Sequence, residues 1–204
     1  MMGSGGEPRA RTMAPGSAAN KVETSSCLLV LAHPRLDRSR VNAALAAEAS
    51  LIPGVEILDL YERYPDYQID VAAEQRRMLS HNVICLQFPF LWYSIPSLLK
   101  EWFDLVWLHG FAYGGSSSQL EGKTLFCATT TGGDSASYEI GGRNGHTMDE
   151  FLRPLERTAA LCRMRWAEPW VLHDAPRQLD ELLTQARAQY RDQISAMIRR
   201  SPLT

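Results

Sequence analysis

The chain has 204 residues, of which 45% are hydrophobic and 22% are charged, and it carries a formal net charge of −2 at pH 7. These proportions are typical of one globular domain that is large enough to bury a core, and they exclude collagen-like, coiled-coil and largely disordered proteins. The nearly neutral balance also argues against a nucleic-acid-binding protein, whose surface carries a basic excess.

The first 26 residues differ from the rest of the chain. They are rich in Gly, Ser, Ala and Pro, show no hydrophobic periodicity and contain no apolar segment of the kind that a signal peptide requires. We therefore expect a disordered leader over residues 1–26, followed by one domain over residues 27–204. No two cysteines form a CxxC pair and three lie within apolar runs, which is typical of buried thiols in a reduced, cytoplasmic compartment; they are Cys27, Cys85, Cys127 and Cys162.

Short apolar runs alternate with helical patterns along this domain. Buried strands are predicted over residues 27–33, 54–60, 82–88, 123–131 and 168–174. Helices are predicted over residues 39–50, 71–80, 95–107, 148–164 and 177–200. This alternation predicts an α/β three-layer sandwich with helices on both faces of a parallel sheet, and five strands favour the flavodoxin-like order 2-1-3-4-5 over the Rossmann order.

In such a sheet, ligands bind beyond the carboxyl ends of the first, third and fourth strands. The first of these loops, HPRLDRSRVN (residues 33–42), contains Ser39, a residue that caps helices. The free N–H groups at a helix N-terminus bind anions such as phosphate. The loop contains no glycine, so it is neither a Walker loop nor a GxGxxG fingerprint. The alternative is a plain capped loop in which His33 has no special role.

The second loop, FPFLWYS (residues 88–94), gathers aromatic rings where Pro89 is expected to break the strand. Rings at this edge of the sheet suit a flat conjugated ligand, because offset stacking adds about 0.5–1.5 kcal/mol beyond area burial. A hydrophobic lid or a subunit contact is the alternative. A membrane span is excluded, because Lys100, Glu101 and Asp104 interrupt the apolar stretch that follows.

The third loop, TTTGGDSASYEIGGRNGH (residues 129–146), combines glycines that let backbone approach a ligand with threonine hydroxyls that can donate to it. The alternative is a mobile loop, and a glycine-rich loop alone is weak evidence. The three loops together supply an anion site, an aromatic wall and polar donors, which are the requirements of flavin mononucleotide. We expect no metal, because no His, Cys and carboxylate cluster has ligand spacing, and the absence of a GxSxG motif disfavours a hydrolase.

Several ordered motifs resemble those of the flavodoxin-like NAD(P)H:quinone oxidoreductases of the DT-diaphorase type. The motifs are HP with a later Ser and Asn (residues 33–42), the block FPFLWYSIPSLLKEWFD (residues 88–104), the block HGFAYG (residues 109–114) and TTGG followed by a tyrosine (residues 130–138). Within this family the chain is most similar to the KefF/KefG group, the ancillary proteins of glutathione-regulated potassium efflux. The resemblance covers residues 27–174.

The resemblance implies roles for individual residues. The phosphate and ribityl end of the flavin would be held by His33, Ser39, Arg40, Val41 and Asn42, and the ring would be lined by Phe90, Leu91, Trp92 and Tyr93. The polar edge of the ring would be bonded by Thr130, Thr131, Gly132 and Gly133. Tyr138 and His146 would be catalytic, although extra glycine-rich residues separate them, and Phe111 and Tyr113 would line a substrate pocket across a dimer interface. His173 and His81 lie outside the three loops, and structural or surface roles are expected for them.

The implied activity is a ping-pong transfer of two electrons from NADPH or NADH through FMN to a quinone, with FAD left open as the flavin. The implied assembly is a cytoplasmic homodimer. The alternative is a regulatory subunit that activates a glutathione-gated potassium/proton antiporter, which would place it at the inner face of the membrane through that partner. A related azoreductase or flavin electron carrier is the third interpretation.

Overall fold

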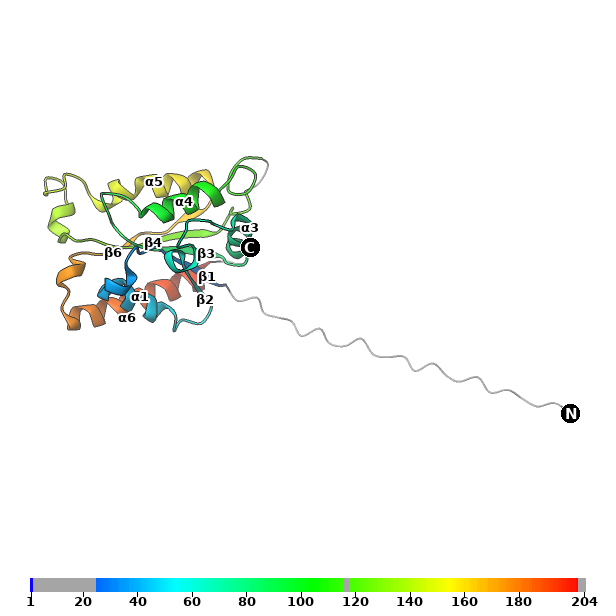
Figure 1. Cartoon of the computed structure of the whole chain (residues 1–204), viewed down its shortest axis with the longest axis horizontal. Helices are drawn as coiled ribbons and strands as arrows, with labels where there is room; N and C mark the ends of the chain where they lie inside the picture. The colour runs from blue at the N-terminus through cyan, green and yellow to red at the C-terminus, as the bar shows by residue number, and fades with distance from the viewer. Residues whose placement is uncertain (2–24, 116–117, 202–204) are drawn as a thin grey trace.

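The computed structural model describes residue 1, residues 25–115 and residues 118–201 (Figure 1). Most of the leader predicted over residues 1–26 therefore lies outside the described residues, and the predicted domain is described as far as Ser201.

A parallel sheet lies at the centre of the fold, with strand order β2-β1-β3-β4-β5. Its strands are β1 (Cys27–Leu31), β2 (Val55–Asp59), β3 (Val83–Pro89), β4 (Thr124–Thr130), β5 (Arg165–Trp166) and β6 (Trp170–Leu172). Every residue of β1, β3 and β4 is buried, because helices cover both faces of the sheet. The predicted flavodoxin-like order is confirmed.

The fifth strand position differs from the prediction. Instead of one strand over residues 168–174, the two short strands β5 and β6 both pair with β4. The Ala167 N–H still donates to the Leu125 carbonyl, but β4 then advances three residues, from Leu125 to Ala128, while the edge chain advances four, from Trp166 to Trp170. One extra residue therefore bulges out of the pairing beside Pro169, which has no N–H to donate. The third strand ends at Pro89 as expected, and Pro89 is itself its last paired residue, opposite Thr130.

Helices on the two faces divide the core into two halves. The helices α1 (Arg40–Ala49) and α6 (Asp180–Arg200) lie together on one face, and α3 (Val71–Leu79), α4 (Ser97–Val106) and α5 (Met148–Leu161) belong to the other half of the fold (Figure 1). Alternate strand residues enter opposite halves, so that Leu28 and Val30 pack on the α4 side while Leu29 and Leu31 pack on the α1 side. None of the described helices is both long and apolar enough to span a membrane.

Short helical turns were not predicted, and three of them follow strands at the carboxyl edge. They are the 3₁₀ turns Leu36–Arg38 after β1, Ser135–Tyr138 after β4 and Ala175–Arg177 after β6. A further short helix, α2 (Leu60–Arg63), follows β2. The loops that the sequence singled out therefore contain local backbone hydrogen bonds of their own.

The helix after the aromatic loop is anchored by a buried carboxylate. Trp102 Nε1 on α4 donates to Glu74 Oε2 at 3.2 Å, and the Tyr64 hydroxyl donates to Glu74 Oε1 at 2.8 Å. Both Trp102 and Glu74 are completely buried, so Trp102 belongs to the core. All four cysteines are buried free thiols, whereas the apolar runs predicted burial for three of them, and burial raises the pKa of the Cys162 thiol to about 11.

Candidate functional site

Two clefts at the carboxyl edge of the sheet share Phe90 and Gly132 in their walls. The first, here called the α1 cleft, has a volume of about 490 Å³, and the second, the tyrosine cleft, has about 460 Å³. Every residue predicted to contact the cofactor lines one of them. The α1 cleft is lined by His33, Arg35, Arg38, Ser39, Arg40, Val41, Asn42, Pro89, Phe90, Leu91, Thr130, Thr131, Gly132, Ala175 and Pro176. The tyrosine cleft is lined by Phe90, Trp92, Tyr93, Gly132, Gly133, Asp134, Ser137, Tyr138, Arg143, Asn144 and Arg177.

The amino end of α1 forms one wall of the α1 cleft. Ser39 caps the helix as predicted, and its Oγ accepts from the Asn42 backbone N–H at 3.3 Å. The Asn42 side chain crosses to the sheet, where Nδ2 donates to Thr130 Oγ1 at 3.0 Å. Asn42 Oδ1 is buried and has no hydrogen-bond partner. A buried carbonyl oxygen without a partner is costly, so this residue is suited to a ligand that supplies a donor.

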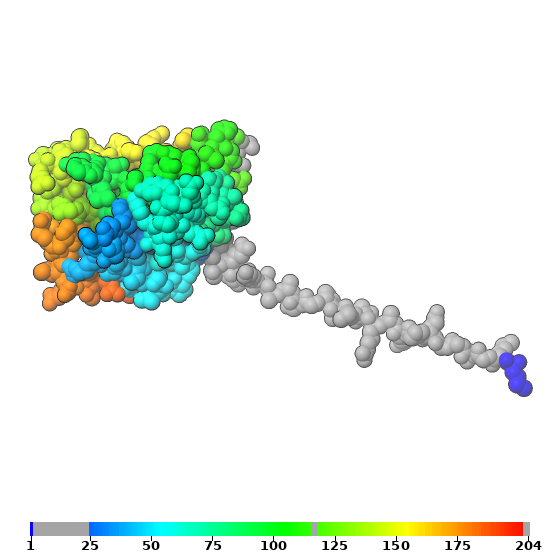
Figure 2. Space-filling model, in the orientation of Figure 1, coloured from blue at the N-terminus to red at the C-terminus, as the bar shows by residue number. Residues whose placement is uncertain are grey.

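Basic side chains surround the same wall. Arg40 is bound to the Asp180 carboxylate and to the Gln178 carbonyl, which joins α1 to the start of α6. Figure 2 shows the blue surface of the α1 region and the orange surface of this α6 region on the same side of the molecule. Arg35 pairs with Asp37, whereas Arg38 approaches that carboxylate only to 4.0 Å. The α1 cleft thus combines free helical N–H groups with guanidinium groups, which together attract an anion.

The His33 ring contributes a neutral donor. Its Nδ1 accepts from the Arg35 backbone N–H at 3.1 Å, and burial of the half-buried ring lowers its pKa. A ring nitrogen that accepts a hydrogen bond carries no proton, so the proton of neutral His33 lies on Nε2. His33 lines the α1 cleft and therefore offers it an N–H donor.

The aromatic loop is a tight two-residue turn that the sequence did not reveal. Leu91 and Ser94 exchange two backbone hydrogen bonds of 3.1 and 2.9 Å, and the residues between them, Trp92 and Tyr93, have φ angles of 49° and 60°. This left-handed conformation normally requires Gly or Asn and costs other residues about 1–2 kcal/mol each. Trp92 is also 95% exposed. Strain of this kind is typical of functional sites.

Four rings pack beside this turn. Phe90 lies 6.1 Å from Tyr138 and 5.4 Å from Phe151, while Tyr93 stacks on Phe151 at 5.4 Å with an interplanar angle of 24°. Phe90 is buried beneath the others, whereas Leu91, Trp92 and Tyr93 are exposed. Phe151, which belongs to α5, was not predicted, because a lone phenylalanine on an amphipathic helix gives no signal beyond core packing.

Tyr138 lies against a histidine that the sequence analysis placed elsewhere. His173 follows β6, and its ring centroid lies 5.3 Å from that of Tyr138. Thr131 Oγ1 donates to the Gly133 carbonyl at 2.8 Å and lies 3.0 Å from His173 Nδ1, so the threonine oxygen accepts the Nδ1 proton. Burial lowers the pKa of His173 and raises that of Tyr138, which keeps the imidazole neutral and the phenol protonated.

His146, which the resemblance implied as catalytic, lines neither of the two clefts. Its side chain is exposed, its Nδ1 is 3.5 Å from the Glu150 carboxylate, and its ring packs edge-on against Phe151 at 5.8 Å. The glycine-rich loop that separates His146 from Tyr138 instead brings Asn144 to the site, where its Oδ1 accepts from the Tyr93 hydroxyl at 3.4 Å.

Phe111 and Tyr113 line neither of the two clefts. Phe111 is buried in the core beside α4, and Tyr113 packs edge-on against His109 at 5.6 Å, a contact that requires the Cβ-free Gly114 beneath the His109 ring. Tyr113 lines a separate apolar groove of about 430 Å³ that α4 and α5 form and that extends to Tyr93.

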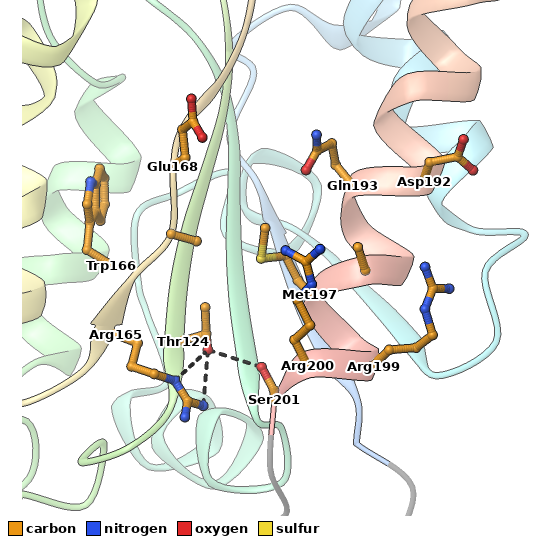
Figure 3. A pocket seen from close by; sticks show the side chains of 12 residues that line it. Thr124, Arg165, Trp166, Glu168, Asp192, Gln193, Met197, Arg199, Arg200 and Ser201 are labelled. Atoms are coloured by element: carbon orange, nitrogen blue, oxygen red, sulfur yellow. Dashed lines mark hydrogen bonds between the residues drawn. The ribbon is translucent and has the colours of Figure 1, made fainter.

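A further hollow of about 790 Å³ lies at the opposite, amino edge of the sheet between β5 and the end of α6 (Figure 3). It is lined by none of the predicted site residues. Arg165 donates to Thr124 Oγ1 there, and Arg199 and Arg200 occupy the last turn of α6, where cations offset the negative end of the helix dipole. Among the described residues, no three His, Cys, Asp or Glu side chains gather as metal ligands.

A family model described as the flavodoxin-like fold matches residues 25–194, and the chain belongs to this family. The chain is 44% identical over 167 residues to the glutathione-regulated potassium-efflux system ancillary protein KefG of Cronobacter sakazakii, and the alignment covers 81% of this chain and 91% of KefG. The resemblance stated from the sequence motifs is therefore confirmed.

Solved structures of similar fold carry different names. A thermophilic tryptophan halogenase from Streptomycin violaceusniger has a TM-score of 0.79 at 38% identity over 81% of this chain and 96% of that chain. General stress protein 14 of Treponema denticola, solved with FMN, has a TM-score of 0.79 at 32% identity over 84% and 99%. An NADPH-quinone reductase from P. pentosaceus has a TM-score of 0.77 at 28% identity over 83% and 97%. Fold and family therefore do not determine the reaction, which depends on the residues of the site.

Proposed function

We propose that the protein binds FMN and transfers two electrons from NADPH or NADH to a quinone. The observation that carries this proposal is the joining of the two clefts at Phe90 and Gly132. One cleft suits a phosphorylated polyhydroxyl chain, and the other suits a flat ring. The FMN complex of general stress protein 14 and the NADPH-quinone reductase, both of similar fold, support the same cofactor and reaction class.

The phosphate and ribityl chain of FMN would lie in the α1 cleft. The first turn of α1 supplies N–H groups and the positive end of a ten-residue helix, and Arg38 supplies a guanidinium group at the rim. The unpartnered Asn42 Oδ1 fits a ribityl hydroxyl, which would donate to it. The neutral His33 ring adds an N–H donor.

The isoalloxazine ring would lie in the tyrosine cleft beside the strained turn. The left-handed Trp92 and Tyr93 hold two aromatic side chains exposed at the carboxyl edge of the sheet, where they would contact the ring. The Gly132–Gly133 segment has no side chain, so its backbone would approach the polar edge of the ring closely.

Bound flavin would accept a hydride from the nicotinamide and pass two electrons to the quinone. The chain contributes hydrogen bonding and the placement of protons. Tyr138 stays protonated and its hydroxyl would donate toward the negative charge that reduction creates. His173 bonds to Thr131 through Nδ1, and its ring packs against the Tyr138 ring. The position of Tyr138 therefore depends on the loop after β4 and on the loop after β6. His146, predicted as catalytic, packs its exposed ring on Phe151, and from there it would contact an acceptor at the rim of the site.

We further propose a homodimer in which a second copy covers the groove between α4 and α5. Tyr93 lies at the site end of this groove and Tyr113 also lines it. A two-fold axis across the groove would bring Tyr113 of each copy toward the tyrosine cleft of the other, with Phe111 supporting it from the core. Exposed apolar side chains beside the groove, Leu108 and Leu161, are consistent with a covered surface.

The second candidate function is regulation of a potassium/proton antiporter. The specific observation that favours it is the 44% identity to KefG over 91% of that protein. The protein would then be cytoplasmic and would reach the inner face of the membrane through its partner. Co-purification with such an antiporter from detergent extracts tests this role, and recovery of the antiporter without the protein would argue against it.

The experiment that tests cofactor binding is the identification of the molecule bound to the purified protein. We expect heat to release a yellow compound with the mass and retention of FMN. Release of FAD would correct the identity of the flavin, and a colourless protein that neither flavin reconstitutes would refute the proposed function.

A further inference from the structure

Gln87 is a fully buried amide in the middle of the sheet. It lies on β3, opposite Leu31 of β1 and Ala128 of β4, and its side chain has no exposed surface. A buried amide is costly unless its donor and acceptor are both satisfied. A polar residue at this position of a buried strand therefore indicates a specific requirement for hydrogen bonding.

Both ends of the Gln87 amide are bonded, and each partner comes from a different helix. Nε2 donates to the Asn42 backbone carbonyl at 2.9 Å, and Oε1 accepts from the Tyr190 hydroxyl at 2.8 Å. Tyr190 belongs to α6, is completely buried and packs on Trp170 of β6 at 5.1 Å. The amide of Gln87 therefore joins α1, the sheet and α6 at one point.

The Asn42 carbonyl belongs to the first turn of α1, where Ser39 is the cap. In the same turn the Asn42 side chain bonds to Thr130 Oγ1 at the end of β4. The turn is thus held to the sheet at two places. The Asn42 side chain bonds to Thr130 on β4, and the Asn42 backbone carbonyl bonds to Gln87 on β3. The orientation of this turn therefore sets the orientation of the N–H groups that form the wall of the α1 cleft.

We propose that Gln87 is a positioning residue that fixes the amino end of α1 relative to β4, so that the free N–H groups of the helix meet the phosphate of the flavin. The inference rests on the proposed function for the identity of the ligand. Anion binding at the edge of the sheet would then depend on the buried Gln87 amide. Tyr190 of α6 would support the site by holding this amide, although Tyr190 does not itself line the α1 cleft.

The test compares FMN with riboflavin, which lacks the phosphate, by fluorescence titration of the apoprotein. Gln87→Met keeps the side-chain length but removes both hydrogen bonds. We expect the ratio of FMN to riboflavin affinity to fall about tenfold, as the loss of the hydrogen bond to the Asn42 carbonyl predicts. A merely structural role would weaken both ligands equally and leave the ratio unchanged, which would overturn the proposal.

Two further variants complete the design. Tyr190→Phe removes only the hydroxyl that holds Gln87 Oε1, and we expect a fall of about threefold in the ratio. Tyr64→Phe is the matched control, since it removes a similar buried tyrosine bond, to Glu74, in the other half of the core. It should lower the melting temperature and leave the ratio unchanged. A fall of the ratio in Tyr64→Phe as large as in Gln87→Met would also refute a specific role.

A measurement without any ligand separates this inference from the proposed function. Binding of neither flavin by the wild-type protein would refute the proposed function alone. Amide hydrogen exchange of the ligand-free protein still tests Gln87, because the Asn42 carbonyl lies in the hydrogen-bonded part of α1. The quantity compared is the amide exchange rate of residues 43–49 divided by that of β1. We expect this ratio to be about tenfold higher in Gln87→Met than in Tyr64→Phe. Equal rates in the two variants would contradict the positioning role.

Discussion

The strained turn at Trp92 predicts a substitution that stabilises the protein while it damages the site. Trp92 has a φ of 49° and is 95% exposed, and the two hydrogen bonds of the turn join the backbones of Leu91 and Ser94. Replacing this side chain therefore loses almost no buried area and no hydrogen bond. Asparagine tolerates the left-handed region, whereas other side chains pay about 1–2 kcal/mol there.

We expect Trp92→Asn to raise the free energy of unfolding by about 1 kcal/mol, which corresponds to about 2–4 °C in melting temperature for a domain of this size. Urea unfolding of the apoprotein measures the free energy, and flavin titration measures the loss of ring contact. The matched control is Trp92→Ala, which also removes the indole but lacks the side-chain amide that lets asparagine tolerate the left-handed region.

The two variants separate strain from ring contact. Flavin affinity should fall in both, whereas only Trp92→Asn should gain stability over the wild type. A free energy of unfolding that is unchanged or lower in Trp92→Asn, or equal in the two variants, would refute the view that this turn stores strain for the site.

Three other predictions concern the clefts. Asn42→Asp places a carboxylate beside the phosphate site, so FMN affinity should fall more than tenfold while riboflavin affinity changes little in the same titration; equal losses would contradict a phosphate in the α1 cleft. Tyr138→Phe should retain flavin but slow its reduction by NADPH about tenfold in stopped flow, and an unchanged rate would remove Tyr138 from the catalytic residues. Burial lowers the pKa of His33 and of His173, so the unfolded chain binds more protons and stability falls as the pH drops below about 6.5 through the folded pKa values. The double variant His33→Gln/His173→Gln should show a smaller difference in urea midpoint between pH 7 and pH 5, and a difference as large as that of the wild type would be the contrary result.

The parts of the fold that depend on hydrophobic pattern were predictable. Continuous apolar runs at the first, third and fourth strands indicated a covered parallel sheet, and their order followed from the strand count. Ser39 was recognised as a helix cap because capping depends on a short local pattern. The fifth strand differs from the prediction because β5 directly follows a helical pattern and because one extra residue between Trp166 and Trp170 offsets their pairing with β4.

The parts of the site that depend on three-dimensional contact were not predictable in the same way. The position of His173 against Tyr138 results from the pairing of β6 with β4, which no local pattern encodes. The signal that was present is the place of His173 directly after the fifth strand position, at the same edge of the sheet as the three loops. The left-handed turn at Trp92 was hidden because turn chemistry predicts Gly or Asn there, and the sequence has Trp and Tyr.

The most direct test of the central claim is a double-mixing stopped-flow experiment on the flavin-loaded protein without oxygen. Mixing with NADPH or NADH should bleach the flavin absorbance, and a second mixing with a quinone should restore it with one quinone reduced for each flavin. Flavin that is bound but that neither nicotinamide reduces, or reduced flavin that a quinone does not reoxidise, would contradict the account.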